Sequence, residues 1–305
     1  MRSLPFYDLN SGSDSGDIGT SRYADLGAGT DAPEYLYALY FNRTMLGKDG
    51  TAKLYAAAET GTLTWESIAV IAKEIPSRVS DIGIQNDANI LGAVAAKLSG
   101  VDYIKKDASG VPKLEVSDGD LLKIDSLIES VAKLTLYQPT EGAAPAADRF
   151  KSGELVFYLG TLSDICDFYD EKTEWGLLPL PSEQNLGAIR DDRPAICLPV
   201  TCTRFEQTSI WLSGFNAASG EWIRDDLLRI SIEKYLRDNS SCLSMAKILE
   251  QKAEIGFERV FAGYYDGLAA ATYEGAVEAA FGNIRYSDTY ANKLSAINKK
   301  LAKIP

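Results

Sequence analysis

Histidine is absent from the 305-residue chain, and its absence removes several classes of function. Imidazole is the usual transition-metal ligand and the usual general base near neutral pH. Without it, neither a Ser-His nor a Cys-His nucleophilic pair can form. Glycoside hydrolysis needs only two carboxylic acids, but the best adjacent acids, Asp191 and Asp192, lie in a polar stretch before Pro194 that is typical of a solvated loop. The sequence therefore does not predict an enzyme.

Basic residues are also scarce. The chain has 31 Lys and Arg against 43 Asp and Glu, a net charge of −12, so we expect no nucleic-acid partner. No apolar run approaches the ~20 residues that a membrane-spanning helix needs. The N-terminal stretch MRSLPFYDLNSGSDSGDIGTS lacks the charged-then-apolar pattern of a secretion signal. The chain is thus either cytoplasmic or separated from its leader.

Cysteine is rare, and no two cysteines form a Cys-x-x-Cys pair, which argues against zinc-ribbon and thioredoxin-like sites. We expect Cys166, Cys197, Cys202 and Cys242 to be mostly buried free thiols, and we expect no metal. The stretch 27–32 matches the letters of a dinucleotide fingerprint, GxGxxA. Pro33 and an alternating, strand-like segment follow it instead of a helix, so no cofactor is expected.

The remaining pattern indicates an α/β protein. Strands alternate with amphipathic helices, which predicts a largely parallel sheet covered on both faces. Thr64 should cap a helix that Pro76 stops, with Trp65 and Ile68 on its buried stripe. The expected strands are 34–42, 154–159, 175–179 and 195–200, with a hairpin around Ser109-Gly110. The expected helices are 53–59, 64–75, 87–98, 120–134, a brief helix ending at 151, and 205–217, 221–236, 241–254, 264–280 and 288–302.

Four blocks of sequence, in order, carry a resemblance to a known family. They are YALYFNRTMLG (37–47), LYAAAETGTLTWESIAVIAKE (54–74), FKSGELVFYLG (150–160) followed by WGLLPLPSEQ (175–184), and YLRDNSSCLSMAKIL (235–249). Together the blocks resemble the family 1 extracellular solute-binding proteins of carbohydrate ABC transporters, in a lineage common among Gram-positive gut bacteria. The resemblance covers roughly residues 34–305.

This resemblance implies a type 2 periplasmic-binding-protein-like fold: two α/β lobes joined by hinge strands that close on a sugar. On that basis we expect four segments. Residues 1–42 are a remnant of the first lobe with the first hinge strand, and 43–195 form the second lobe. Residues 196–238 hold the return hinge and first-lobe helices, and 239–305 the C-terminal helices of the second lobe. The second lobe is then complete and the first truncated, lacking its N-terminal part.

The resemblance also implies a function: non-enzymatic binding of an oligosaccharide as the extracytoplasmic component of an ABC importer. The expected partners are a carbohydrate and the permease transmembrane subunits, and the protein is expected to be a monomer. In full-length form it would be a cell-surface lipoprotein, with signal and lipobox absent from this chain. The alternative is a truncated or decayed paralogue, acting if at all as a surface scaffold without tight sugar binding.

Sugars are held by aromatic platforms and by paired hydrogen bonds. Carried over by position, the expected ligand-binding residues are Tyr35, Gln85, Asn86, Thr161, Leu162, Asp164, Tyr264 and Tyr265. Asp164 has a second interpretation as a cap of the next turn, and the two tyrosines 264–265 as helix-start packing. Trp65, Trp175, Trp211 and Trp222 are expected in the core.

Overall fold

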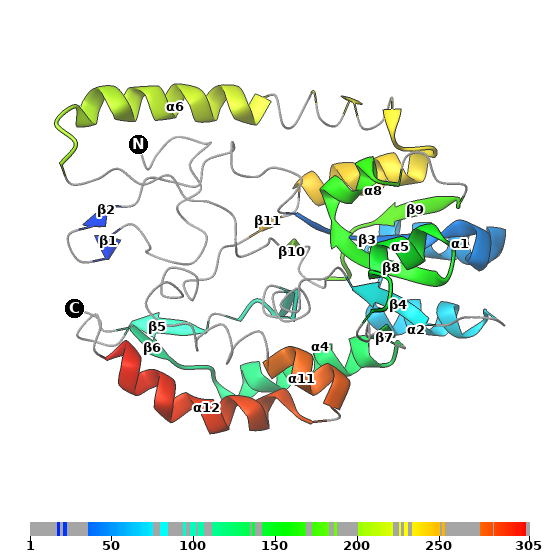
Figure 1. Ribbon diagram of the computed structural model, residues 1–305, viewed down its shortest axis with the longest axis horizontal. Coiled ribbons are helices and arrows are strands. Elements are labelled where there is room, and N and C mark those ends of the chain that lie inside the picture. Colours follow the sequence, from blue (N-terminus) through cyan, green and yellow to red (C-terminus); the bar gives the residue numbers. More distant parts are fainter. Residues whose placement is uncertain are drawn as a thin grey trace.

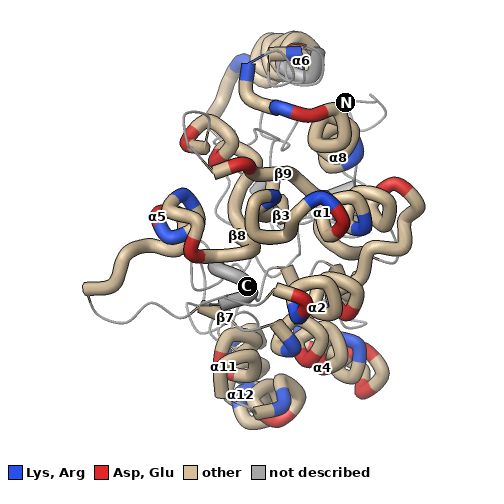
Figure 2. Tube along the Cα trace, turned by 90° about the vertical axis from the view of Figure 1, so that its right-hand side faces the viewer, with Lys and Arg blue, Asp and Glu red and all other residues tan. Residues whose placement is uncertain are grey.

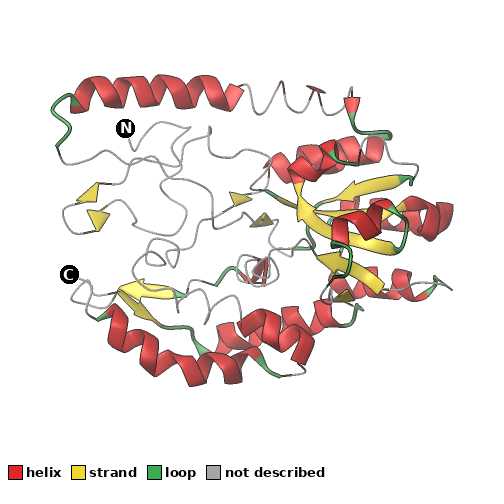
Figure 3. Ribbon diagram, viewed as in Figure 1, coloured by secondary structure: helices red, strands yellow, loops and turns green. Residues whose placement is uncertain are grey.

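The computed structural model shows an α/β protein in which helices flank a central sheet (Figures 1 and 3). The structure describes residues 17–18, 21–22, 36–75, 80–84, 94–95, 98–101, 103–106, 112–134, 136–137, 142–168, 173–182, 186–187, 201–221, 226, 229–230, 234–250, 252–253, 275–282 and 284–302.

The central sheet has five strands in the order β7-β4-β8-β3-β9. They are β3 (Tyr37–Asn42), β4 (Ser80–Ile84), β7 (Leu136–Tyr137), β8 (Leu155–Thr161) and β9 (Trp175–Leu178). β4 is parallel to β7 and β8, but β3 is antiparallel to β8 and β9. The prediction of a largely parallel sheet is therefore wrong for β3. Two helices, α1 (Arg43–Thr60) and α2 (Trp65–Lys73), lie between β3 and β4 in the chain. Because β4 runs opposite to β3, it begins at the edge of the sheet where β3 ends.

Helix α2 begins directly after Thr64, as the sequence predicts, and ends at Lys73, two residues before the predicted end. The Thr64 side chain accepts a hydrogen bond from the Ser67 backbone nitrogen at 3.1 Å, and Ser67 Oγ accepts one from the Thr64 nitrogen at 3.0 Å. This reciprocal capping box satisfies donors that a helix N-terminus leaves without partners. The predicted stripe residues Trp65 and Ile68 are buried, and so are Ile71 and Ala72 on the same helix.

Helix α1 differs from the prediction. The expected helix 53–59 is part of a longer helix that starts at Arg43 and bends at Gly47, whose φ of +67° a residue with a Cβ rarely adopts. The Asn42 side chain caps this start by accepting from the Met45 nitrogen at 3.0 Å. Gly61, at φ +71°, ends the helix in the left-handed conformation.

The two faces of the sheet are covered by different helices. On one face lie α1, α2 and α4 (Asp118–Ala132). Helices α11 (Gly275–Gly282) and α12 (Tyr286–Leu301) pack on α4 and extend the same hydrophobic core. On the other lie α5 (Ala146–Lys151), the 3-10 turn η3 (Leu162–Cys166) and α8 (Asn239–Glu250). β3 supplies both cores, as its alternation predicts: Leu39 and Phe41 face the first, Ala38 and Tyr40 the second. Figure 2 shows α5 and α1 on opposite sides of β3 and β8.

Helix α8 is held to the sheet by a partly buried polar cluster around Asp238. Asp238 Oδ1 accepts from the Ser241 nitrogen at 2.9 Å, and Oδ2 accepts from Tyr55 Oη of α1 at 3.1 Å. The Ser241 hydroxyl in turn accepts from the Leu177 nitrogen of β9 at 3.1 Å. Arg43 lies 3.4 Å from the same carboxylate. The Arg-Asp-x-x-Ser motif in the fourth of the family-like sequence blocks therefore joins α8, α1 and β9.

The predicted hairpin is confirmed in its strands, β5 (Ile104–Lys106) and β6 (Pro112–Leu114), which pair antiparallel. It is attached to α12 through Asn298, whose Oδ1 accepts from the Leu114 nitrogen at 2.8 Å and whose Nδ2 donates to Leu114 oxygen at 3.1 Å. Two short pairs complete the described strands: β1 (Asp17–Ile18) with β2 (Ser21–Arg22), and β10 (Leu186–Gly187) with β11 (Lys252–Ala253).

Helix α6 (Phe205–Glu221) carries exposed aromatic side chains. Trp211 is 64% exposed and stacks on Phe215, with ring centroids 5.5 Å apart. The prediction that Trp211 is a core residue is therefore wrong, because apolar spacing alone does not show that a neighbouring element covers the helix face. Trp65 and Trp175 are buried as predicted, and Trp222 lies outside the described residues.

The three described cysteines are free, as predicted, but not buried. Cys166 is exposed, and Cys202 and Cys242 are partly exposed. Cys197 and the predicted strand 195–200 lie outside what the structure describes. Of the predicted helix 221–236, the structure describes only 221, 226, 229–230 and 234–236. Among the described helices, none is both long and apolar enough to span a bilayer.

Candidate functional site

The carboxyl ends of the parallel strands meet at one edge of the sheet, where ligands of α/β proteins commonly bind. β8 ends there at Thr161, which pairs with Tyr37 at the start of β3. β9 runs in the same direction as β8, because both are antiparallel to β3, so Pro179–Ser182 also follow this edge. Two polar structures lie along it: the turn after β8, and a pocket beside α2.

The turn after β8 is organised by Asp164. Asp164 Oδ2 accepts from the Thr161 nitrogen and from Tyr158 Oη, both at 3.0 Å, and Oδ1 accepts from Thr161 Oγ1 at 3.2 Å. Tyr40 Oη donates to the Thr161 backbone oxygen at 2.7 Å. The turn is thus closed by its own hydrogen bonds.

Gly160 permits this arrangement. A Cβ at position 160 would lie 2.2 Å from Asp164 Oδ2 and 2.3 Å from Cε1 of Tyr158, closer than real side-chain contacts allow. The sequence predicts that the strand stops at Gly160, whereas β8 continues through Thr161. The glycine therefore leaves room for the tyrosine and the carboxylate to approach each other, and does not end the strand.

Burial sets the electrostatics of the turn. Desolvation raises the pKa of Asp164 above its ordinary value, although hydrogen bonds from Tyr158 and Thr161 partly oppose it. Desolvation and the nearby carboxylate raise the pKa of Tyr158 and of Tyr40 as well. Both hydroxyls therefore remain protonated donors at neutral pH.

Three of the eight predicted ligand-binding residues lie in this turn. Thr161 is 1% exposed, Leu162 is fully buried in the second core, and Asp164 is partly exposed. Asp164 does cap the turn, as its second interpretation holds. The other five, Tyr35, Gln85, Asn86, Tyr264 and Tyr265, lie outside the described residues. Contact with a ligand stays a prediction for all eight.

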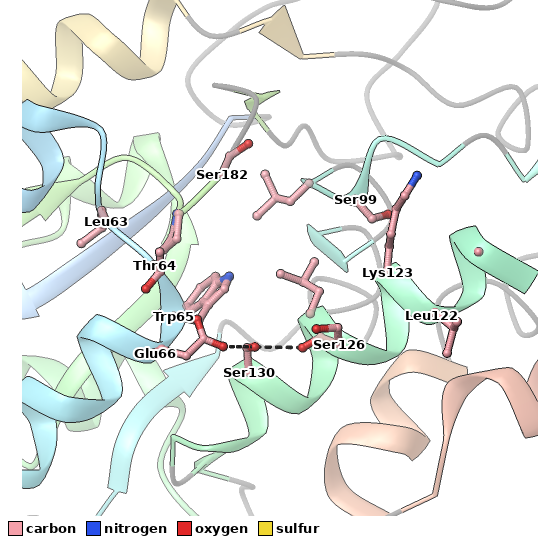
Figure 4. Close-up of a pocket in the computed structure, with 14 residues that line it drawn as sticks. Leu63, Thr64, Trp65, Glu66, Ser99, Leu122, Lys123, Ser126, Ser130 and Ser182 are labelled. Atoms are coloured by element: carbon pink, nitrogen blue, oxygen red, sulfur yellow. Dashed lines mark hydrogen bonds between the residues drawn. The ribbon is translucent and has the colours of Figure 1, made fainter.

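A pocket of about 500 Å³ lies between the first turn of α2 and helix α4 (Figure 4). It is on the face of the sheet opposite the Asp164 turn. Sequence reasoning missed this pocket, because its walls come from segments far apart in the chain. Its lining residues are Leu63, Thr64, Trp65, Glu66, Leu98, Ser99, Gly119, Leu122, Lys123, Ser126, Leu127, Ser130, Pro181 and Ser182.

Trp65 is the unusual member of this lining. The side chain is 3% exposed, and its Nε1–H has no acceptor within hydrogen-bond distance among the residues the structure describes. Leaving a buried donor without a partner costs about 1–3 kcal/mol. By contrast, Trp175 on the other face donates from Nε1 to the Phe168 oxygen at 2.8 Å.

The charged groups at the pocket are paired. Glu66 Oε1 accepts from the Ser130 hydroxyl, and Lys133 Nζ lies 3.3 Å from the same oxygen. The Ser130 hydrogen bond, with help from Lys133, lowers the pKa of Glu66, so this carboxylate is ionised at neutral pH. Lys123 Nζ lies 2.7 Å from Asp120 Oδ1. Within the described part of the chain, no three His, Cys, Asp or Glu residues are grouped closely enough to hold a metal ion.

Comparison with known proteins gives a match only at the level of structure. No family model matches the chain, and no curated protein does. The GacH receptor of Streptomyces glaucescens, solved without ligand and with acarbose, aligns over 100% of this chain and 77% of its own, with a TM-score of 0.54 and 13% identity.

Two further structures give similar results. The sugar-binding protein MalE of Xanthomonas citri covers 89% of this chain and 70% of its own, with a TM-score of 0.54 and 13% identity. UgpB of Mycobacterium tuberculosis, in complex with glycerophosphocholine, aligns over 97% of this chain and 76% of its own, with a TM-score of 0.52 and 13% identity. At this identity the likeness establishes the fold alone. The chain has the fold of the periplasmic-binding-protein-like solute-binding proteins of ABC transporters, as the four sequence blocks predict.

Proposed function

We propose that this protein binds an oligosaccharide without transforming it, as the extracytoplasmic substrate-binding component of an ABC importer. The observation that carries the proposal is the alignment of the whole chain with a receptor solved in complex with acarbose. A second neighbour is named a sugar-binding protein. Binding proteins of this kind need no catalytic groups, which agrees with a sequence that has no histidine.

The edge of the sheet offers suitable chemistry. Sugars present hydroxyl groups and apolar C–H faces, so their sites combine polar side chains with aromatic rings. The partly exposed Asp164 provides a carboxylate at this edge. Our proposal adds Gln85 and Asn86 after β4, and Tyr264 and Tyr265 as stacking rings.

The proposal extends to the partners and the location of the protein. A monomeric chain would close its two lobes on the sugar through hinge segments near 38–42 and 196–201, and deliver it to the permease transmembrane subunits. In full-length form it would be anchored at the cell surface as a lipoprotein. Ligand binding favours the closed state only through its higher affinity for that state.

Titration calorimetry tests this function directly. We expect acarbose or lacto-N-biose, each bound in a structurally similar protein, to bind with a micromolar Kd, about 8 kcal/mol of binding free energy. Replacement of Tyr264 or Tyr265 by alanine should weaken that binding about ten-fold or more, because the stacking surface is lost. Asp164→Asn should also weaken it, whereas Asp148→Asn on exposed α5 should not.

Two results would contradict the proposal. Absence of heat with every sugar would favour the alternative, a surface scaffold without tight sugar binding. Release of reducing sugar would instead indicate a glycosidase.

A further inference from the structure

The pocket between α2 and α4 is a second candidate binding site. It lies on the α2 side of the sheet, whereas the turn that holds Asp164 packs on the other side. Its volume of about 500 Å³ falls within the range of small-molecule sites. All of its lining residues are in the described part of the chain.

The indole of Trp65 indicates that this pocket accepts a ligand. Figure 4 shows the indole nitrogen turned toward the space between α2 and α4. This nitrogen is buried, and among the described residues no acceptor reaches it. Buried donors in folded proteins nearly always have partners. A ligand that enters the pocket could place an acceptor atom beside Nε1 and form the hydrogen bond that this donor lacks.

The lining selects the kind of molecule. Hydroxyl groups, each able to donate and accept, surround the space; they belong to Thr64, Ser99, Ser126, Ser130 and Ser182. Aliphatic side chains form the rest of the wall; they belong to Leu63, Leu98, Leu122, Leu127 and Pro181. This mixture suits a compact molecule that carries both hydroxyl groups and C–H surface.

The charges argue against an ionic ligand. Each charged lining residue already has an opposite charge beside it: Lys133 for Glu66 at 3.3 Å, and Asp120 for Lys123 at 2.7 Å. An anion would meet the ionised Glu66, and a cation would meet the ammonium of Lys123. A neutral molecule loses less solvation on entry and breaks neither pair.

We propose that this pocket binds a neutral, polyhydroxylated molecule of monosaccharide size, one of whose oxygens accepts a hydrogen bond from Trp65 Nε1–H. The site is separate from the turn that holds Asp164, and its occupancy does not depend on the transport function proposed above.

Nuclear magnetic resonance of the indole N–H groups tests the proposal. With ¹⁵N-labelled protein, the Trp65 signal is assigned by its loss in Trp65→Phe. We titrate glucose, galactose, mannose, N-acetylglucosamine and myo-inositol, with gluconate and glucosamine as charged comparators. The Trp65 signal should move saturably with at least one neutral compound while the Trp211 signal stays in place. No movement at 50-fold excess over protein, or an equal response to the charged compounds, would overturn the assignment.

Variants separate donor loss from pocket loss. Trp65→Phe keeps an aromatic ring and removes the donor, so the affinity measured by calorimetry should fall about ten-fold. Ser126→Trp places a large ring in the pocket from an exposed position on α4 and should abolish binding. Ala132→Trp, exposed on the same helix outside the lining, should bind normally. Equal affinity of Ser126→Trp and the unsubstituted protein would overturn the site.

The same variants distinguish this site from the oligosaccharide site. If both proposals hold, Ser126→Trp loses the monosaccharide but keeps the oligosaccharide, and Asp164→Asn shows the reverse. Oligosaccharide binding that disappears in Ser126→Trp would show that the pocket is part of one shared site and would contradict a separate one.

Discussion

Two tryptophans on opposite faces of one sheet show how differently the same side chain can be built into a protein. Trp65 and Trp175 are 3% and 4% exposed, so both are core residues by burial. The Trp175 indole donates to a backbone oxygen within a cluster of aromatic rings, whereas the Trp65 indole faces a pocket without an acceptor in the described chain. The indole donor of Trp175 is satisfied, whereas that of Trp65 has no partner among the described residues. Burial alone therefore does not separate a packing residue from a binding one.

The largest expected difference in stability between the two faces comes from replacing a glycine by alanine. Gly160→Ala should destabilise the protein by about 3 kcal/mol, because the new Cβ collides with Asp164 and Tyr158 in a tightly packed turn. Gly119→Ala, at the pocket on the other face, meets only Ser117 Oγ at 3.9 Å and should stabilise α4 by about 0.5–1 kcal/mol. Urea unfolding measures both, and an equal effect would show that the turn is not tightly packed.

The tryptophans themselves should differ by a smaller amount. Trp175→Phe removes a donor and leaves the Phe168 oxygen without it, which should cost about 2–3 kcal/mol. Trp65→Phe removes a donor that has no acceptor, so only the lost ring volume counts and the cost should be about 1 kcal/mol. The midpoints of urea unfolding give the comparison. A larger loss of stability in Trp65→Phe than in Trp175→Phe would contradict this prediction.

The carboxylates on the two faces should respond to pH in opposite directions. The pKa of Asp164 is raised from its ordinary 3.8, so the folded state binds more protons than the unfolded state as pH rises through that region, and stability falls relative to Asp164→Asn. The pKa of Glu66 is lowered from 4.5, so its ionised carboxylate stabilises the folded state fully above pH 4.5. This stabilisation, measured relative to Glu66→Gln, is lost as the pH falls through the lowered pKa.

Unfolding of the two variants and the unsubstituted protein between pH 3 and pH 7 measures these slopes (the pH range spans the ordinary carboxyl values). Slopes of the same sign would mean that burial does not dominate at Asp164.

The smallest effect is expected away from both faces, on α6. Trp211→Ser should change the stability by about 0.5 kcal/mol or less, because the ring is 64% exposed and loses mainly its stack on Phe215. Thermal unfolding checks this. A loss as large as that of Trp175→Phe would show that Trp211 is packed in solution.

Local patterns predicted local structure well. The Thr64 cap, the stripe of α2 and the alternation of β3 depend on residues within a few positions of one another, and all are found in the structure. The four sequence blocks also predicted the fold that the structural neighbours share.

Features made by distant segments were not predictable in the same way. The reversed direction of β3 depends on how two helices return the chain, and the pocket joins α2 to α4 through a contact between Glu66 and Ser130, 64 residues apart. The exposure of Trp211 depends on what covers α6, which no periodicity reveals. Of the predicted site, the turn around Asp164 is described, and its capping role was anticipated as one of two interpretations.

The carboxylate of Asp238 has a consequence for how the molecule opens. It holds Ser241 and Tyr55, and the Ser241 hydroxyl accepts from Leu177, which precedes it by 64 residues. Because one side chain secures the start of α8, the edge strand and α1 at once, none of the three can detach without exposing the polar groups of the other two. Slow amide exchange in α8 should therefore match that of β9, and the two should lose protection together as a single cooperative unit.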